Sequence, residues 1–156
     1  MDIDHNYAVT IEWLGNRGVG TADYKSYGRE NRVSANGKTA FIDGTSDPAF
    51  RGTPERWNPE ELLLAALSQC HLLSYLHVAA MNGIVVTAYL DQAVGEMRQT
   101  RDGGGHFTSA TLRPVVTISA GDPALAEELH AEASEKCFIE SSINFPVLHE
   151  VTIVVN

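Results

Sequence analysis

The chain of 156 residues contains little positive charge. Its 11 Lys and Arg residues stand against 20 Asp and Glu residues, which gives a formal net charge of −9. Proteins that bind nucleic acid carry an excess of Lys and Arg, because these side chains neutralise the phosphates. We therefore expect no nucleic-acid partner.

The sequence also lacks the patterns of export and of membrane insertion. The segment Met1-Asp-Ile-Asp-His-Asn is acidic and polar, unlike a signal or transit peptide. The longest apolar run is broken by Gln69, Cys70 and His71, so it is shorter than the about 20 residues that span a bilayer. We expect a cytoplasmic protein without a membrane partner.

Cysteine is scarce, since Cys70 and Cys137 are the only two in the chain. In a reducing compartment they are unlikely to form a permanent structural disulfide. Each is also explained by a purely structural role, because free cysteine is commonly buried and packs as a small apolar side chain. Composition alone favours that structural role, and spacing does not show that the two residues meet.

Alternating apolar residues and turn residues predict an α+β fold in the order βββ-α-ββ-α-β, forming a single domain over residues 1–156. The expected strands cover residues 7–13, a stretch from Thr21, 38–43, 84–98, 106–119 and 147–155. A second helix is expected from Asp122-Pro123 up to Cys137. Pro114 predicts that part of its strand lies at an edge or a bulge, because proline cannot donate to a ladder.

The segment Asn58-Pro59-Glu60-Glu61 predicts the start of a central helix. Asn58 suits the cap, Pro59 the first helical position, and Glu61 the acidic position of a capping box. The helix is expected to run to about Asn82. It is rich in Leu and Ala on nearly all sides, so we expect antiparallel sheets packed on a buried helix.

The segment from Trp57 to Cys70, Trp-Asn-Pro-Glu-Glu-Leu-Leu-Leu-Ala-Ala-Leu-Ser-Gln-Cys, resembles the signature of a known family. This is the osmotically inducible protein C and organic hydroperoxide resistance (OsmC/Ohr) family, in which the reactive cysteine follows ten residues after the Glu of Asn-Pro-Glu. Glu60 and Cys70 keep that spacing. Cys137, followed by Ser141 and Ser142, and the turn Arg17-Gly-Val-Gly-Thr are similar too. The likeness covers nearly the whole chain and favours the OsmC-like branch.

The resemblance implies a thiol peroxidase that reduces organic hydroperoxides to alcohols and needs no cofactor. Cys70 is then the residue that forms a sulfenic acid, and Cys137 resolves it as a disulfide. An external dithiol, of the dihydrolipoyl type in this family, restores both thiols by exchange.

The resemblance also implies an Arg–Glu pair that stabilises the Cys70 thiolate. Burial raises a thiol pKa, so a nearby cation is needed, and Arg holds a carboxylate and a thiolate together through its several donors. Glu60 matches the Glu. Arg51 is the first choice for the Arg and Arg17 the second, although either is equally well explained as a solvated loop residue.

Helix geometry adds an expectation about assembly. Ten residues at about 1.5 Å each place Glu60 roughly 15 Å along the axis from Cys70 of the same chain. Two antiparallel helices related by a two-fold axis bring Glu60 of one chain beside Cys70 of the other, and Ala65 and Ala66 at the midpoint permit close approach. We expect an intertwined two-fold homodimer with composite sites.

The surroundings of Cys70 favour an organic substrate only weakly. The candidate pocket residues, for which core packing is the simpler role, are Leu73, Leu76, Phe138, Ile139 and Phe50. The chain also departs from the family pattern. Family members often carry Cys-Pro where this chain has Cys137-Phe138-Ile139-Glu140, and Glu140 adds a negative charge that raises the thiol pKa. His71 replaces a large apolar residue beside Cys70.

Two other classes of function stay open. One is a metal site that uses Cys70 and His71 with His77, His106 or His149. It is disfavoured because adjacent helical residues face different directions and no Cys-x-x-Cys or His-x-x-x-His pair is present. The other is a redox sensor or a small-molecule binding protein on the same fold, because a fold does not fix a function.

Overall fold

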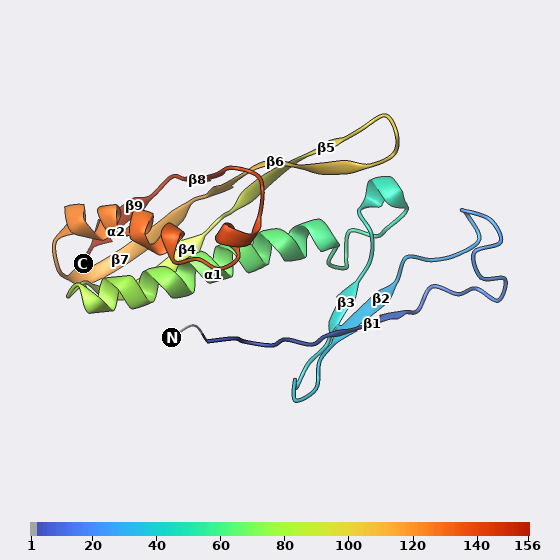
Figure 1. Cartoon of the computed structure of the whole chain (residues 1–156), viewed down its shortest axis with the longest axis horizontal. Coiled ribbons are helices and arrows are strands. Elements are labelled where there is room, and N and C mark those ends of the chain that lie inside the picture. Colours follow the sequence, from blue (N-terminus) through green and yellow to red (C-terminus); the bar gives the residue numbers. More distant parts are fainter. Residues whose placement is uncertain (1–2) are drawn as a thin grey trace. The chain divides into compact units, whose positions relative to one another are not determined.

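The computed structural model describes residues 3–156 (Figure 1). The chain divides into two compact units, Met1–Leu62 and Leu63–Asn156. The single domain over residues 1–156 stays a prediction. The mixed content of helices and sheets confirms the predicted α+β class.

The first unit is built on a three-stranded antiparallel sheet. Its strands, in the spatial order β1-β2-β3, are β1 (Thr10–Trp13), β2 (Asn31–Ser34) and β3 (Ile42–Gly44). The strand expected from Thr21 begins ten residues later, at Asn31. The intervening segment turns instead, because Oδ1 of Asp23 accepts from the Lys25 N–H at 2.8 Å and Oγ of Ser26 accepts from the Asp23 N–H at 3.1 Å.

The central helix α1 covers Pro59–Met81 and begins as predicted. Oδ1 of Asn58 accepts from the Glu61 N–H at 2.8 Å, and Oε2 of Glu61 accepts from the Asn58 N–H at 3.1 Å. This reciprocal pair is a capping box. Gly83 follows the helix with a φ of 73°, a conformation that glycine adopts without strain.

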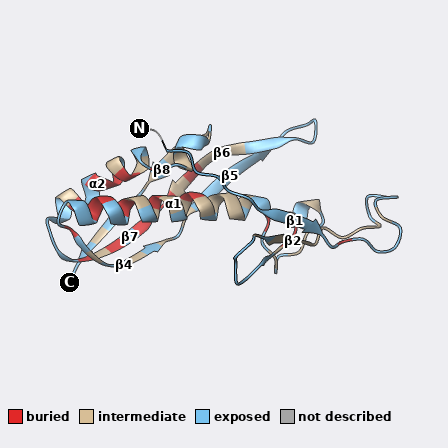
Figure 2. Ribbon diagram, turned by 60° about the horizontal axis from the view of Figure 1, so that its bottom comes forward, coloured by how far each residue is buried: buried red, intermediate tan, exposed pale blue. Residues whose placement is uncertain are grey.

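The burial expected for α1 is wrong in part, since the helix buries one stripe (Figure 2). The buried residues are Leu67, His71, Tyr75, Val78 and Ala79. Leu73 is 61% exposed and Met81 73% exposed, so one apolar face of α1 is uncovered in the single chain. By length and composition α1 is also the one helix among residues 3–156 that qualifies as a membrane span, a criterion that core helices of soluble proteins also meet.

Two three-stranded sheets form the second unit, in the orders β4-β7-β9 and β5-β6-β8. Their strands are β4 (Val85–Asp91), β5 (Val94–Gln99), β6 (Gly105–Leu112), β7 (Pro114–Ala120), β8 (Val147–His149) and β9 (Thr152–Val155). Each long strand expected here is therefore two strands, one in each sheet. The pairs β6–β8 and β7–β9 are parallel, which corrects the purely antiparallel expectation.

The position of Pro114 within its sheet differs from the prediction. It is the first residue of β7, which is the central strand of its sheet rather than an edge. A proline is accommodated at a strand's first residue, where the missing N–H removes little from the ladder.

The core lies where α1, α2 (Pro123–Glu135) and β7 meet. The side chain of Asp122 caps α2 by accepting from the Ala124 N–H at 3.0 Å. The buried core residues are Tyr75, Val78, Ala79, Ile84, Val116, Ile118, Ala126, Leu129 and Ala133. After α2 the chain forms a short 3-10 helix, η2 (Glu140–Ser142), and then enters β8.

Candidate functional site

The fold brings Cys70 and Cys137 together within the second unit. Cys70 lies in the middle of α1 and is partly exposed, whereas Cys137 follows the end of α2 and is fully buried. Both thiols are free, and the Cys70 thiol is close enough to raise the pKa of Cys137. Two cysteines that are 67 positions apart in the sequence are therefore neighbours in the fold.

Burial, together with the neighbouring Cys70 thiol and the Glu140 carboxylate, raises the pKa of Cys137 to about 12. The backbone N–H of Glu140 donates to Sγ of Cys137 at 3.4 Å and opposes this shift. Cys137 is therefore a neutral thiol at physiological pH. Since a nucleophile needs a thiolate and access to its substrate, the partly exposed Cys70 is the better placed of the two.

Cys70 opens into a surface hollow of about 480 Å³. The lining residues are Cys70, Leu73, Ser74, His77, Lys136 and Phe138. Leu73 and Phe138 line the hollow as expected, whereas Leu76 and Ile139 do not. Ile139 instead packs against a second buried cluster, formed by Leu67, Ala110 and Leu112. His77 was grouped with Cys70 only in the metal-site alternative, and Lys136 was missed as a group beside Cys70, because nothing in its spacing points to that contact.

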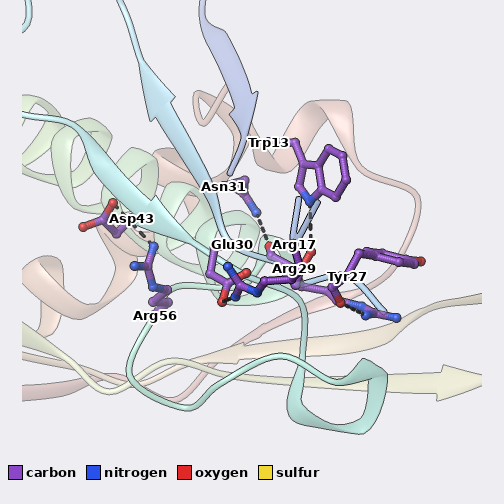
Figure 3. Close-up of polar contacts among 9 residues, drawn as sticks. Trp13, Arg17, Tyr27, Arg29, Glu30, Asn31, Asp43 and Arg56 are labelled. Carbon is purple, nitrogen blue, oxygen red and sulfur yellow. Dashed lines mark hydrogen bonds and ion pairs between the residues drawn. The ribbon is translucent and has the colours of Figure 1, made fainter. Parts of the chain in front are cut away.

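The predicted Arg and Glu residues belong to the first unit. The Arg17 guanidinium forms an ion pair with Glu30, as Figure 3 shows. The pKa of Glu30 is lowered by its own backbone N–H, by Arg17 and by Arg56. Arg17 is thus engaged with an acid other than the predicted Glu60.

Neither Arg51 nor Glu60 forms an ion pair with any other residue of the described range 3–156. Arg51 is exposed, and its backbone closes the 3-10 helix η1 (Pro48–Phe50) in the left-handed conformation, with a φ of 68°. Oε2 of Glu60 is shielded from solvent and has no hydrogen-bond partner. Among residues 3–156, no hydrogen bond or ion pair joins Glu60 to Arg51 or Arg17.

A cluster of histidines lies on the inner side of α1. Nε2 of His71 is 2.9 Å from Nδ1 of His130. The Tyr75 ring stacks on His130, and the His149 ring lies tilted beside His71 with centroids 4.5 Å apart. Burial lowers the pKa of His71 to about 4 and that of His130 to about 3, so both imidazoles are neutral at pH 7.

This cluster contains only part of the ligand set that the metal-site hypothesis named. His77 and His106 are exposed residues outside it, while His71 and His149 lie near Glu140, which the sequence reasoning did not consider as a ligand. His130 was missed as well. It is separated from His71 by 59 residues, and no local spacing signals such a contact.

Comparison with known proteins gives the family of this chain. Residues 52–152 match the model of the OsmC-like protein family. The chain belongs to the OsmC-like family. The match includes both cysteines and Glu60, so the resemblance drawn from the Asn-Pro-Glu motif is confirmed.

This OsmC-like chain is similar to proteins from several bacteria. It is 27% identical to the uncharacterized protein YmaD of Bacillus subtilis (strain 168), over 90% of this chain and 87% of that protein. An OsmC-like protein of unknown function from Vibrio cholerae is 28% identical, with a TM-score of 0.84 over 95% of this chain and 99% of that one.

Solved structures of organic hydroperoxide resistance proteins share the fold. The protein from Elizabethkingia anophelis aligns over 99% of this OsmC-like chain and 100% of its own, with 16% identity and a TM-score of 0.66. The protein from Legionella pneumophila aligns over 97% and 99%, with 19% identity and a TM-score of 0.66. These two likenesses establish a common fold.

Proposed function

We propose that this protein is a thiol peroxidase that reduces organic hydroperoxides. The observation that carries the proposal is the pairing of a partly exposed Cys70 with the buried Cys137 beside it. Structural neighbours described as organic hydroperoxide resistance proteins support the same class of activity.

In the first step, the Cys70 thiolate attacks the terminal oxygen of the hydroperoxide. The O–O bond breaks, the sulfur becomes a sulfenic acid, and the alkoxide takes up a proton and leaves as an alcohol. Leu73 and Phe138 in the hollow beside Cys70 favour an apolar organic group over the small, polar hydrogen peroxide.

In the second step, Cys137 resolves the sulfenic acid. Its sulfur bonds to that of Cys70, and the hydroxyl of the sulfenic acid leaves as water with the thiol proton. A neutral, buried thiol suits this role, because it is protected from peroxide and still adjacent to Cys70. An external dithiol, which we propose to be of the dihydrolipoyl type, then reduces the disulfide and is itself oxidised.

The thiolate of Cys70 needs a cation, which we assign to an Arg held by Glu60. Arg51 is the first candidate, because Arg17 is already paired with Glu30. Glu60 and Cys70 are ten residues apart on α1, or roughly 15 Å along its axis. We therefore propose a homodimer in which Glu60 of one chain serves Cys70 of its partner.

The exposed apolar surface of the single chain supports such an assembly. All four residues of β1 are exposed, Ile11 by 61%, and the uncovered face of α1 carries Leu73 and Met81. Water-exposed apolar groups on this scale are typical of surfaces that bind another chain. The acidic composition is compatible with the cytoplasmic location that we propose.

The deciding experiment treats the reduced protein with one equivalent of cumene hydroperoxide or of hydrogen peroxide. We expect both thiols to disappear, with a mass loss of about two hydrogens for one disulfide, and faster with the organic peroxide. The Cys70→Ser variant should keep its remaining thiol, and Cys137→Ser should accumulate sulfenic or sulfinic acid at Cys70.

Other outcomes contradict the proposal in distinct ways. Thiols that survive the peroxide unchanged would indicate a binding protein. A disulfide that forms rapidly but is not turned over with dihydrolipoamide or any other dithiol would indicate a sensor.

A further inference from the structure

Three side chains from three elements of the second unit converge at Glu140, whose backbone contacts Cys137. They are His71 of α1, Glu140 of η2 and His149 of β8. One ligand atom from each lies within 4.8 Å of the others. His71 is fully buried, and the side chains of His149 and Glu140 are only 18% and 15% exposed.

Three polar atoms of this cluster make no hydrogen bond to any of residues 3–156. Nδ1 of His71, Oε2 of Glu140 and Nε2 of His149 are shielded from water, and only the last two form an ion pair. The last two lie 3.6 Å apart, which is too long for a hydrogen bond. Each buried polar atom without a partner costs about 1–3 kcal/mol, so three in one place require an explanation. A bound cation satisfies all three at once.

The remaining polar atoms of two of these side chains are held by neighbours. Nε2 of His71 faces Nδ1 of the buried His130 at 2.9 Å. When this nitrogen of His71 carries the proton and donates it to His130, the lone pair of Nδ1 is free for an ion. Oε1 of Glu140 accepts from the Ser134 hydroxyl at 2.6 Å, which leaves Oε2 available. Hydrogen bonds of this kind, made to the atoms of a ligand side chain that do not bind the metal, are the usual support of metal ligands.

The separations suit a small transition-metal ion. Ligand atoms about 2.1 Å from a tetrahedral ion lie about 3.4 Å apart, close to the spacing of His149 and Glu140. The three ligand atoms lie within 4.8 Å of one another, so side-chain shifts on the order of 1 Å are needed to bring all three to bonding distance from one ion. Two imidazoles and one carboxylate favour Zn²⁺ and related divalent metals over Mg²⁺ and Ca²⁺, which prefer oxygen ligands.

One ligand side chain of the cluster, His149, also borders a surface hollow. His130 and His149 line a second surface hollow, of about 540 Å³, together with Glu127 and Glu128. These two carboxylates raise the local concentration of cations at its mouth. The His149 side of the cluster therefore borders a hollow whose lining residues differ from those of the hollow beside Cys70.

We propose that His71, Glu140 and His149 bind one divalent transition-metal ion per chain, with His130 as a positioning residue for His71. Three protein ligands leave a coordination position for water or a small ligand. The site does not depend on the peroxidase proposal, since neither cysteine is among its ligands.

The test uses the full chain after treatment with a chelator and a thiol reductant. Titration with Zn²⁺ in a calorimeter should show one equivalent bound per chain and a Tm that rises with Zn²⁺ concentration. Co²⁺ in place of Zn²⁺ should give the visible absorption of a four- or five-coordinate site without the intense charge-transfer band of a thiolate ligand.

Ligand variants are chosen among the partly exposed residues, so that the fold is preserved. We expect His149→Ala and Glu140→Gln to weaken Zn²⁺ binding by more than about 100-fold, which exceeds the usual effect of changing a residue that only supports a ligand. His77→Ala, an exposed histidine outside the cluster, is the matched control and should bind as the parent does. Circular dichroism verifies folding of each variant.

The positioning role of His130 has its own measurement. His130→Leu removes the acceptor for His71 and should weaken binding about 10–100-fold with a changed Co²⁺ spectrum. His130→Asn supplies an amide oxygen near the position of Nδ1 and should restore part of both. A merely structural His130 would alter stability without this difference in the spectrum.

Two results would overturn the proposal. One is Zn²⁺ binding that is equally tight in folded His149→Ala, Glu140→Gln and parent protein, or that is undetectable in all three. The other is loss of the one-equivalent site in the Cys70→Ser/Cys137→Ser double variant, which would assign the metal to the thiols.

Discussion

The backbone N–H of Glu140 donates a hydrogen bond to Sγ of Cys137 at 3.4 Å. Glu140 therefore touches the second cysteine with its backbone, while its carboxylate faces the histidine cluster. The replacement of the Cys-Pro found in many family members by Cys137-Phe138 leaves the turn of η2 intact. The departure noted in the sequence is thus compatible with a Cys137 that stays beside Cys70.

Cys137 should react slowly with iodoacetamide in the folded, reduced and metal-free protein. Burial raises its pKa to about 12, against an ordinary thiol pKa of about 8.5. Its rate should therefore keep rising beyond pH 10, whereas in urea it should level off above about pH 9. Alkylation followed by peptide mass spectrometry measures this, with Cys70 as the internal reference. Equal folded and unfolded rates at pH 7.5 would refute the assignment.

Arg51→Met should slow the reaction of Cys70 with cumene hydroperoxide by about tenfold or more, since one unit of thiol pKa changes the thiolate fraction tenfold. Arg51→Lys should lose less, because it keeps the charge but not the fork of donors. Arg17→Met is the comparison, and stopped-flow thiol kinetics is the measurement. A larger loss in Arg17→Met than in Arg51→Met would transfer the role to Arg17.

A composite site predicts recovery of activity on mixing two inactive variants. In Glu60→Gln the cysteines are intact, and in Cys70→Ser Glu60 is intact. After joint unfolding and refolding, half the dimers are mixed and each has one complete site, so about a quarter of the parent activity should return. Peroxidase assays of the mixture and of each variant alone check this. A mixture no more active than its components would argue for sites within one chain.

Asn58→Ala should lower the free energy of unfolding by about 0.5–2 kcal/mol, because the cap of α1 is lost. The hydrogen bond at stake joins Oδ1 of Asn58 to the Glu61 N–H at 2.8 Å. Urea denaturation followed by circular dichroism provides the value. Asn6→Ala, an exposed position outside every helix and strand, serves as control and should change stability by less than about 0.5 kcal/mol.

Glu30→Gln should destabilise the protein at pH 7 but not at low pH. The pKa of Glu30 is lowered in the folded state, so its contribution is present above its ordinary pKa of about 4.5 and is lost as the pH falls below that. The ion pair with Arg17 is largely exposed, so we expect less than about 1 kcal/mol. Urea midpoints at pH 7 and pH 3.5 test this, and a difference that grows at pH 3.5 would contradict it.

Local signals predicted the parts of the fold that depend on neighbouring residues. Asn58, Pro59 and Glu61 define the start of α1 within four positions, and Asp122 does the same for α2. The break between β8 and β9 carries no such signal. It arises because the Glu150 N–H pairs with the Leu112 carbonyl, a contact that only the folded sheets create.

The residues of the candidate site also fall into two groups, those that local sequence signals predict and those that only the folded structure brings together. Cys70 and Glu60 follow from one motif, and Cys137 from the family pattern, but the neighbourhood of His71 and His130 depends on how α2 packs against α1. Burial of α1 was overestimated from its composition. An apolar helix surface is equally expected for a core and for an interface with another chain.

The parallel pairing of β8 with β6 and of β9 with β7 gives this small protein many contacts between residues distant in sequence. Residues 147–155 complete both sheets of the second unit, and β8 also contributes His149 to the proposed metal cluster. Topologies with such high contact order fold slowly, because the entropy of closing long loops is lost before the contacts form. We therefore expect the proposed metal cluster to be completed among the last events of folding, because His149 reaches it only when the final strands are in place.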